Sequence, residues 1–381
     1  MRAIGIVSEY DPFHSGHQYH IAETRNMLGE DLPVVCAMSG NWTQRGGPAI
    51  ADKWIRARLA LMGGADLVLE LPTPWATASA ETFAKGAVEI LARAGVDVLS
   101  FGSESGDVES LRSVARCLDS EEYREVLRRE LDKGISFAAA RQAAAEKMIG
   151  SAAECLDHPN NNLAIEYLRT IPVLDADIQA VTVKRQGDGH NAPASGGGHA
   201  SASAIRAMLR QGDESAWNWL CPEGKKLLTE FSDFKLAERA VLAKLRTMSP
   251  EQLRVIPDCG EGLENRILEA AGKAGTLEEL YDLAKSKRYA HARIRRVVLR
   301  AFLGIDCIPE RVPYLRVLGM TGRGRELLRN LGEETVITKP AHGKGIELLE
   351  AEARYTDLYA LCFPHVRPSG LEWRNSPVVL P

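Results

Sequence analysis

The sequence lacks paired cysteines and any apolar run long enough to cross a membrane. Its seven cysteines include no CxxC pair, and an odd count fits neither a disulfide framework nor a zinc ribbon. We expect reduced thiols, mostly buried, in a cytoplasmic protein. A membrane span needs about 20 consecutive apolar residues. No uninterrupted run approaches that length, so we expect no contact with a membrane.

An excess of positive charge is also missing, because the formal net charge is −4. The chain as a whole therefore gives no support for a nucleic-acid partner, and any such interface must be a local basic patch. Residues 1–7 enter a polar motif too soon for a signal peptide, and we expect them to form the first β-strand.

The chain has 381 residues, which is long enough for two domains. In the first half, short β-branched segments alternate with helical patterns, as is typical of βαβ units and a parallel sheet. The expected strands are residues 3–8, 33–38, 66–70, 96–101 and 178–184, and the expected helices include 17–28, 52–62 and 80–94. Helical periodicity dominates later. We predict an α/β fold with a Rossmann-like parallel-sheet domain over residues 1–212 and a mainly α-helical domain over residues 213–381.

The strongest chemical signal follows the first predicted strand and reads His14-Ser15-Gly16-His17. His14 and His17 are three residues apart, so they share one side of a starting helical turn. Gly16 lets a nucleotide lie against the backbone, and the free N–H groups at a helix start suit phosphate. Two imidazoles there would donate hydrogen bonds to oxygens that gain charge during attack on an α-phosphate.

Two other interpretations of these histidines stay open. One is that they are ordinary surface or core residues. The other is a metal site that includes His20, although no carboxylate or cysteine completes a recognisable set of ligands. We therefore assign no residue to a metal.

Three further segments hold candidate nucleotide-binding residues. Gly102 ends the fourth strand, where ligands of open parallel sheets bind, but it is equally a simple turn glycine. Asn160 and Asn161 stand before a predicted helix, and capping is the commoner role of such asparagines. Lys184 and Arg185 end the last strand, where cations would meet a triphosphate or simply lie in solvent.

The segment Ser201-Ala202-Ser203-Ala204-Ile205-Arg206 opens a helix after a glycine-rich loop. Hydroxyls and N–H groups at a helix start hold phosphates, and Arg206 adds positive charge; capping the helix is the alternative role of Ser203. The loop over residues 186–200 is expected to close over the substrate, with simple disorder as the alternative.

Two segments are candidates for contacts with an acceptor. Gln44 and Arg45 follow the second strand, and either one is a candidate for orienting a carboxylate. Residues 285–300 contain seven lysines and arginines, a density that suits phosphate binding, and Tyr289 is a candidate for stacking on a base. An ordinary solvated face is the alternative for this basic segment.

Motifs along nearly the whole chain resemble those of the HIGH-superfamily nucleotidyltransferases and, more narrowly, those of the bacterial tRNA(Met) cytidine acetate ligase family. The matching segments are GIVSEYDPFHSGH (5–17), MSGNWTQRGGPA (38–49), GADLVLELP (64–72), FGSES (101–105), HPNNNLAIEY (158–167), TVKRQG (182–187), SASAIR (201–206), KRYAHARIRR (287–296) and YLRVLGMTGRG (314–324). The resemblance implies that the first domain is a nucleotidyltransferase domain and that the helical domain binds tRNA.

The resemblance also implies a reaction. ATP and acetate would give acetyl-adenylate and pyrophosphate, and the acetyl group would then pass to N4 of the wobble cytidine (position 34) of elongator tRNA(Met), forming N4-acetylcytidine. Mg²⁺ would be held mainly by the phosphates, because no carboxylate cage is visible.

By position, the resemblance makes His14 and His17 catalytic. The residues expected to bind ATP are Val7, Ser8, Glu9, Tyr10, Asp11, Pro12, Phe13, His14, Ser15, Gly16, His17, Gln18, Tyr19, His20, Gly102, Asn160, Arg185, Ser203 and Arg206. The residues expected to bind tRNA are Lys287, Arg288, Arg293, Arg295 and Arg296.

The residues alone leave other functions open. An adenylyltransferase that moves AMP onto a phosphorylated cofactor precursor would explain the histidine motif and SASAIR, but it would not require the helical domain. A nucleotide-dependent RNA-binding protein without catalysis would explain the basic segment. A class I aminoacyl-tRNA synthetase is disfavoured because no KMSKS-like segment appears.

Overall fold

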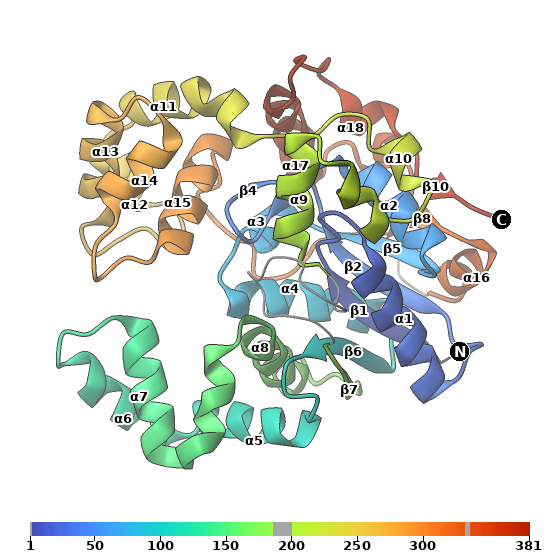
Figure 1. Ribbon diagram of the computed structural model, residues 1–381, viewed down its shortest axis with the longest axis horizontal. Coiled ribbons are helices and arrows are strands. Elements are labelled where there is room, and N and C mark those ends of the chain that lie inside the picture. The colour runs from blue at the N-terminus through green and yellow to red at the C-terminus, as the bar shows by residue number, and fades with distance from the viewer. Residues whose placement is uncertain (1, 186–199, 332–335) are drawn as a thin grey trace.

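The computed structural model describes residues 2–185, 200–331 and 336–381, and a mixed sheet lies at its centre (Figure 1). The strands of this sheet are β1 (Ile4–Ser8), β2 (Val34–Ser39), β5 (Leu67–Leu71), β6 (Val98–Ser103), β7 (Gln179–Lys184), β8 (Leu315–Met320), β9 (Val336–Ile337) and β10 (Val378–Val379). A separate antiparallel hairpin pairs β3 (Trp42–Thr43) with β4 (Gly47–Pro48).

The central strands run parallel in the order β5-β2-β1-β6-β7. The chain order reverses between β1 and β6, and in doubly wound sheets ligands bind beyond the carboxyl ends of the strands at this point. β8 extends the sheet antiparallel to β5, and β9 and β10 each pair with β8. The prediction of an α/β fold with a Rossmann-like sheet is confirmed.

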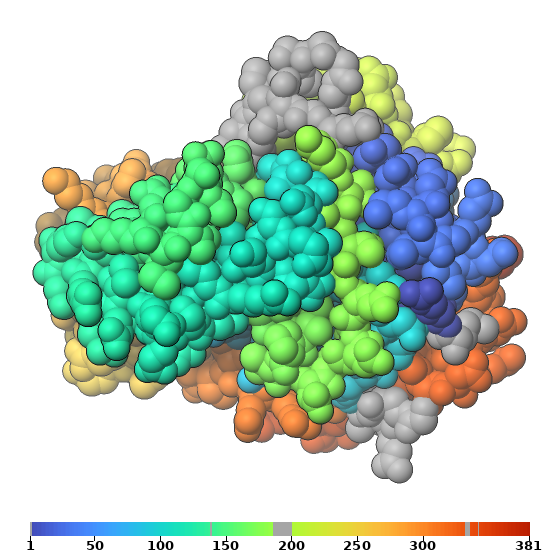
Figure 2. Space-filling view, turned by 90° about the horizontal axis from the view of Figure 1, so that it is seen from below, coloured from blue at the N-terminus to red at the C-terminus, as the bar shows by residue number. Residues whose placement is uncertain are grey.

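Helices cover both faces of the sheet and form two further groups. The helices of the first half are α1 (Ser15–Leu28), α2 (Lys53–Met62), α3 (Thr73–Ala76), α4 (Ala80–Arg93), α5 (Val108–Asp119), α6 (Glu121–Leu131), α7 (Phe137–Ile149), α8 (Pro159–Val173) and α9 (Ala202–Gln211). The later helices are α10 (Gly224–Leu227), α11 (Glu238–Arg246), α12 (Pro250–Arg254), α13 (Leu263–Lys273), α14 (Leu277–Ala284), α15 (His291–Leu303), α16 (Gly322–Asn330), α17 (Glu347–Tyr359) and α18 (Leu371–Arg374). Helices α5–α7 form a lobe at one edge of the molecule (Figure 2).

Alternate residues of the buried strands pack into different cores, as the two-residue period of a strand requires. Val35 and Ala37 face the core that includes α4 and α8, whereas Cys36 and Met38 face the core that includes α1, α2 and α9. Both faces of β2 are therefore apolar. Within the described residues, no helix is both long and apolar enough to cross a membrane.

A third core joins the hairpin to the helices of the second half. The fully buried Trp42 of β3 belongs to the same core as side chains from α11, α13, α14, α15 and α17. The Trp42 indole N–H donates to the Tyr355 carbonyl of α17 at 3.1 Å, and its ring lies 6.4 Å from that of Phe302 on α15. The hairpin at the end of β2 is thus fixed against α15.

Residues beyond the predicted boundary take part in the first sheet, which we did not expect. Strands β8, β9 and β10 all come from the second half and extend the sheet beyond β5. The predicted boundary between the two domains, after residue 212, stays a prediction. The glycine-rich loop predicted to close over the substrate lies outside the described residues except for Ala200.

A buried cluster of charges connects α18 to the sheet. The Lys53 ammonium, at the start of α2, lies 2.6 Å from Glu70 of β5 and 2.7 Å from Glu372 of α18. Arg316 of β8 lies 3.6 Å from Glu372. Burial, with the charge of Glu70 close by, raises the pKa of Glu352 to about 8. Glu70 and Glu372 thus pair with two buried cations, while both carboxylate oxygens of Glu352 accept hydrogen bonds from Thr73.

We predict that Glu372→Ala strongly destabilises the protein, because it leaves the Lys53 and Arg316 charges buried with one partner fewer. Breaking a buried ion pair on one side costs about 3–5 kcal/mol. The free energy of unfolding from urea titration should fall by about that amount. Glu326→Ala removes an exposed glutamate from α16 and should change it by less than about 0.5 kcal/mol. Equal effects of the two substitutions would contradict this account.

Candidate active site

A cavity of about 630 Å³ opens where the carboxyl ends of β1 and β6 meet. This volume lies within the range of small-molecule sites. Its wall includes Val7 and Ser8 from β1 and Phe101 and Gly102 from β6. The cavity therefore occupies the position at which doubly wound sheets bind their ligands.

Most residues predicted to bind ATP line this cavity. They are Val7, Ser8, Glu9, Tyr10, Asp11, His14, Gly16, His17, Tyr19, His20, Gly102, Asn160, Arg185, Ser203 and Arg206. Pro12, Phe13, Ser15 and Gln18 are absent from the lining. Phe13 instead points into the core, where its ring would lie 2.2 Å from a Cβ added to Gly63.

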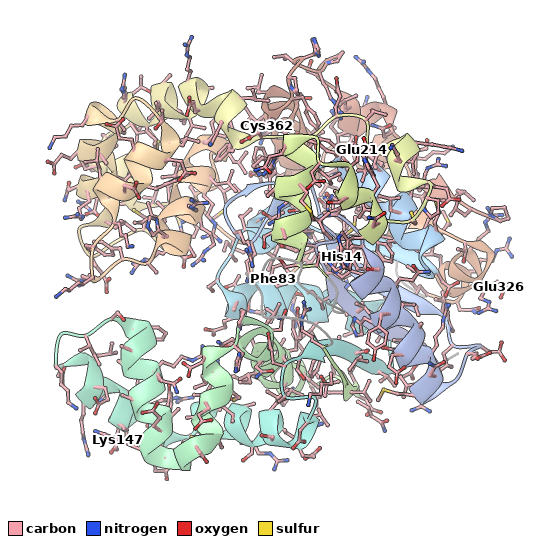
Figure 3. All side chains as sticks on the ribbon, viewed as in Figure 1. His14, Phe83, Lys147, Glu214, Glu326 and Cys362 are labelled. Carbon is pink, nitrogen blue, oxygen red and sulfur yellow. The ribbon has the colours of Figure 1, made fainter. Side chains whose placement is uncertain are left out.

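The two histidines of the motif begin α1 through reciprocal hydrogen bonds. Nδ1 of His14 accepts the Gly16 N–H at 3.0 Å, and Nδ1 of His17 accepts the His14 N–H at 3.3 Å. This is the arrangement of a capping box, built here from imidazoles. The two ring centroids are 3.8 Å apart, and His14 lies at the centre of the molecule in Figure 3. The spacing of the motif thus places both rings at one helix start, as predicted.

These bonds fix which ring nitrogen carries the proton. Because Nδ1 of each ring accepts a backbone N–H, each neutral ring has its proton on Nε2. Burial and then the charges of His14, Arg185 and His20 lower the pKa of His17 well below its usual value. His17 is therefore a neutral hydrogen-bond donor at physiological pH.

His20, one turn further along α1, also stays neutral. Its Nε2 lies 2.9 Å from the Ser100 hydroxyl of β6. Burial, followed by the positive charge of Arg185, lowers the pKa of His20 to about 4. The His20 ring thus connects α1, which follows β1, to β6.

A buried arginine holds the loops beyond the strand ends. The guanidinium of Arg56, on α2, donates to the carbonyls of Ala51 at 2.9 Å, Glu9 at 2.5 Å and Ser39 at 3.1 Å, and also to that of Gly40. The loops that follow β1 and β2 are thus fixed by one side chain, which has no exposed surface.

The acidic residues after β1 are engaged by protein groups. Asp11 accepts the Ile50 N–H at 2.6 Å and pairs with Arg206 of α9 at 3.2 Å. Glu9 accepts the Gln44 N–H at 2.8 Å, and burial raises the pKa of Glu9. Asp11 therefore connects the loop between β1 and α1, called here the histidine loop, to α9. Within the described residues, no group of three His, Cys, Asp or Glu side chains is placed to hold a metal ion.

The structure separates the roles of neighbouring residues in two motifs. Asn160 lines the cavity, whereas Asn161 is buried and accepts the backbone N–H groups of Glu104 and Ser105 at 2.9 and 3.2 Å. Neither asparagine caps α8, which begins at Pro159. In SASAIR, Ser201 caps α9 by accepting the Ala204 N–H at 3.2 Å. Ser203 is inside the helix and lines the cavity, so capping is not its role.

Several cavity residues were not predicted. They include Phe83 and Ala80 of α4, Leu163 and Tyr167 of α8, and Ala292 of α15. Their apolar side chains look like ordinary core residues in the sequence. Gln44 and Arg45 also line the cavity, and their role in orienting a carboxylate stays a prediction.

The predicted tRNA-binding residues lie in different surroundings. Arg293 and Arg288 both pair with Glu261, at 3.2 and 3.7 Å, and Arg296 is half-buried 3.6 Å from Asp258. Lys287 is exposed. Arg295 lines the cavity as well as belonging to the basic segment. Acidic neighbours thus offset much of the positive charge that the sequence suggests.

The suggestion that Tyr289 stacks on a base is wrong for this structure. Its side chain is buried, and its hydroxyl donates to the Glu261 carbonyl. The ring supports the turn before α15 instead.

Known proteins are similar to this chain over nearly its whole length. Residues 1–372 match the family described as HIGH Nucleotidyl Transferase. The chain is 37% identical over 416 residues to a protein of Acetivibrio thermocellus and 38% identical over 416 residues to one of Syntrophomonas wolfei, covering at least 99% of each chain. Both relatives are named tRNA(Met) cytidine acetate ligase.

Two crystal structures of Thermotoga maritima TmcAL are also similar. One is bound with alpha-thio ATP and superposes with a TM-score of 0.91; the other, without ligand, has a TM-score of 0.93. Each is 30% identical in sequence, with all of both chains covered.

We predict that His20 makes stability depend on pH. Its pKa is about 4 when folded and about 6.5 when unfolded, so the unfolded chain binds more protons between these values. The stabilisation is complete above about pH 6.5 and is lost as the pH falls toward 4. Between pH 7 and pH 5 this residue should cost about 1–2 kcal/mol of unfolding free energy. Urea titrations should show a smaller loss for His20→Gln; an identical loss would contradict the assignment.

Proposed function

The chain belongs to the HIGH nucleotidyl transferases and, within them, to the tRNA(Met) cytidine acetate ligases, and on this premise we propose that its cavity forms acetyl-adenylate from ATP and acetate. One observation supports the proposal above all. The His14 and His17 rings both use Nδ1 to accept a backbone N–H at a helix start, which directs their Nε2 atoms away from these bonds, and both rings line a cavity where the strand order reverses between β1 and β6.

The first step is an attack on the α-phosphorus of ATP. An acetate oxygen forms the new bond to phosphorus, the bond to the bridging oxygen of the β-phosphate breaks, and pyrophosphate leaves with the electron pair. The Nε2–H groups of His14 and His17 stabilise the charge that grows on these oxygens. Ser203 and Arg206 of α9 bind the outer phosphates. This chemistry needs positioning and charge stabilisation, and no covalent bond to the protein.

Mg²⁺ would reach the site on the nucleotide. Asp11 already pairs with Arg206, and the described residues offer no cage of carboxylates. The phosphates would therefore supply most of the ligands, and the ion would offset their charge.

The second step transfers the acetyl group within the same cavity. N4 of the wobble cytidine attacks the acetyl carbonyl carbon, the bond from this carbon to the phosphate oxygen breaks, and AMP leaves with the electron pair. N4 loses one proton, so the product is N4-acetylcytidine in elongator tRNA(Met). We place the reaction in the cytoplasm, where the tRNA substrate occurs. The cavity must shield the mixed anhydride from water between the steps.

We predict that exchange of pyrophosphate into ATP requires acetate. In the same preparation, mass analysis of tRNA nucleosides should show N4-acetylcytidine only when ATP, acetate and tRNA are all present. Exchange that requires a phosphorylated metabolite would instead indicate an adenylyltransferase. Absence of any exchange would indicate a nucleotide-dependent RNA-binding protein.

His17→Ala should lower acetate-dependent exchange about 100- to 1,000-fold, the usual effect of removing one such donor. Its affinity for tRNA should stay near that of the wild type. His17→Gln serves as a matched variant, because glutamine at this position also accepts the N-cap N–H. It should restore the thermal midpoint lost in His17→Ala without restoring exchange. Recovery of exchange together with stability would assign His17 a capping role alone.

We also propose that the exposed end of the basic segment contacts tRNA phosphates. Lys287→Ala with Arg288→Ala should weaken tRNA binding and lower the slope of log affinity against log salt by about 1 to 2. Lys225→Ala with Lys226→Ala removes the same charge from α10, which lies apart from α15 in Figure 1. If both double variants change the slope equally, only net charge matters and the surface is not specific.

A further inference from the structure

The cavity extends beyond the predicted nucleotide-binding residues to a helix of the second half. Ala80 and Phe83 of α4 and Leu163 and Tyr167 of α8 give this part of the wall an apolar character, and Arg45 and Arg295 add two guanidinium groups. Phe83 lies on the side of His14 that faces α11–α15 in the view of Figure 3. Figure 1 shows α1 and α15 on opposite sides of β1. This part of the cavity is therefore distinct from the histidine end.

Helix α15 is fixed rigidly at the cavity. Gly46, in the hairpin, has φ of +80°, and a Cβ added there would lie 2.6 Å from the Arg295 carbonyl carbon. Further along the helix, the buried Arg300 contacts the Pro74 carbonyl and the Thr77 hydroxyl, each at 3.4 Å. Arg300 also pairs with Asp258 at 3.1 Å. Contacts at two levels thus hold α15, and with it the backbone of Arg295, against the hairpin and α3.

The surroundings of Arg295 would allow its guanidinium to leave its ion pair with Glu278 and bind another anion. Its guanidinium lies 4.9 Å from the centre of the Tyr281 ring and 3.3 Å from Glu278. The side chain is 40% exposed and that of Glu278 56% exposed, so water weakens this ion pair. A phosphate group, which a guanidinium binds with two parallel hydrogen bonds, can replace Glu278 while the stacking on Tyr281 remains.

We propose that this part of the cavity receives the acceptor base, turned out of the tRNA loop, and that Arg295 binds the phosphate next to it. The inference rests on the proposed function. Proteins that react with a base in RNA take it out of its stack and place it against aromatic or apolar side chains. The partly exposed Ala80 and Leu163, with the small exposed parts of Phe83 and Tyr167, provide an apolar wall of this kind. Arg45 and Arg295 line the same cavity and are at least partly exposed, so they would meet the sugar–phosphate backbone that stays outside it.

Arg295 would then act mainly in the second step, which predicts a loss of coupling between the two half-reactions. With saturating ATP and acetate, the wild type should release about one AMP for each N4-acetylcytidine formed. Arg295→Ala should lower kcat/KM for tRNA by tenfold or more and should raise the ratio of AMP to acetylcytidine several-fold, because adenylate formed without a bound base is hydrolysed or lost. Arg295→Lys keeps the charge without the planar fork and should give intermediate values.

Glu278→Gln is the matched control, because it breaks the same ion pair and leaves Arg295 in place. It should stay within about twofold of the wild type in both quantities. The inference is overturned if Arg295→Ala couples the half-reactions as the wild type does. If the alanine variant does not fold, the same result for Arg295→Lys overturns it. It is also overturned if Glu278→Gln uncouples them equally. A wild type without acetate-dependent exchange would refute the proposed function itself, which is a separate outcome.

Discussion

The hydrogen bonds that begin α1 are the constraint on which the proposed site depends. Nδ1 of His14 and Nδ1 of His17 accept backbone N–H groups, so the same bonds start the helix, set the tautomers and turn both Nε2–H groups away from the backbone. A histidine at each capping position therefore combines a structural and a chemical role. Burial then keeps His17 neutral, so its donor does not depend on pH near neutrality.

The rest of the fold holds the loops around that helix start. Arg56 binds carbonyls beyond β1 and β2, and Asp11 connects the histidine loop to Arg206 on α9. The second half of the chain also packs against this region. Its helices share a core with Trp42 of the hairpin, and Glu372 of α18 pairs with Lys53, which also pairs with Glu70. Helix α15 can therefore place Arg295 on the wall of a cavity that is built mainly by the first half.

Local signals predicted the elements that depend on nearby residues. The first strand, the histidine motif and SASAIR were found because each is a short pattern with its own physical reason. Strand β8 was missed because the buried Arg316 and Gly319 interrupt its apolar pattern. Phe83, Tyr167 and the cavity position of Arg295 depend on packing between distant segments, which spacing in the sequence does not reveal. The wrong assignment of Tyr289 has the same origin, since its partner is the backbone of Glu261.

The most direct measurement of the central claim is a crystal structure with acetate and an ATP analogue that cannot be cleaved between the α- and β-phosphates. We expect Nε2 of both His14 and His17 to lie within hydrogen-bonding distance of oxygens on or next to the α-phosphate, with both Nδ1 bonds intact. Phosphates bound away from the two rings, or rings turned to coordinate a metal ion, would contradict the account.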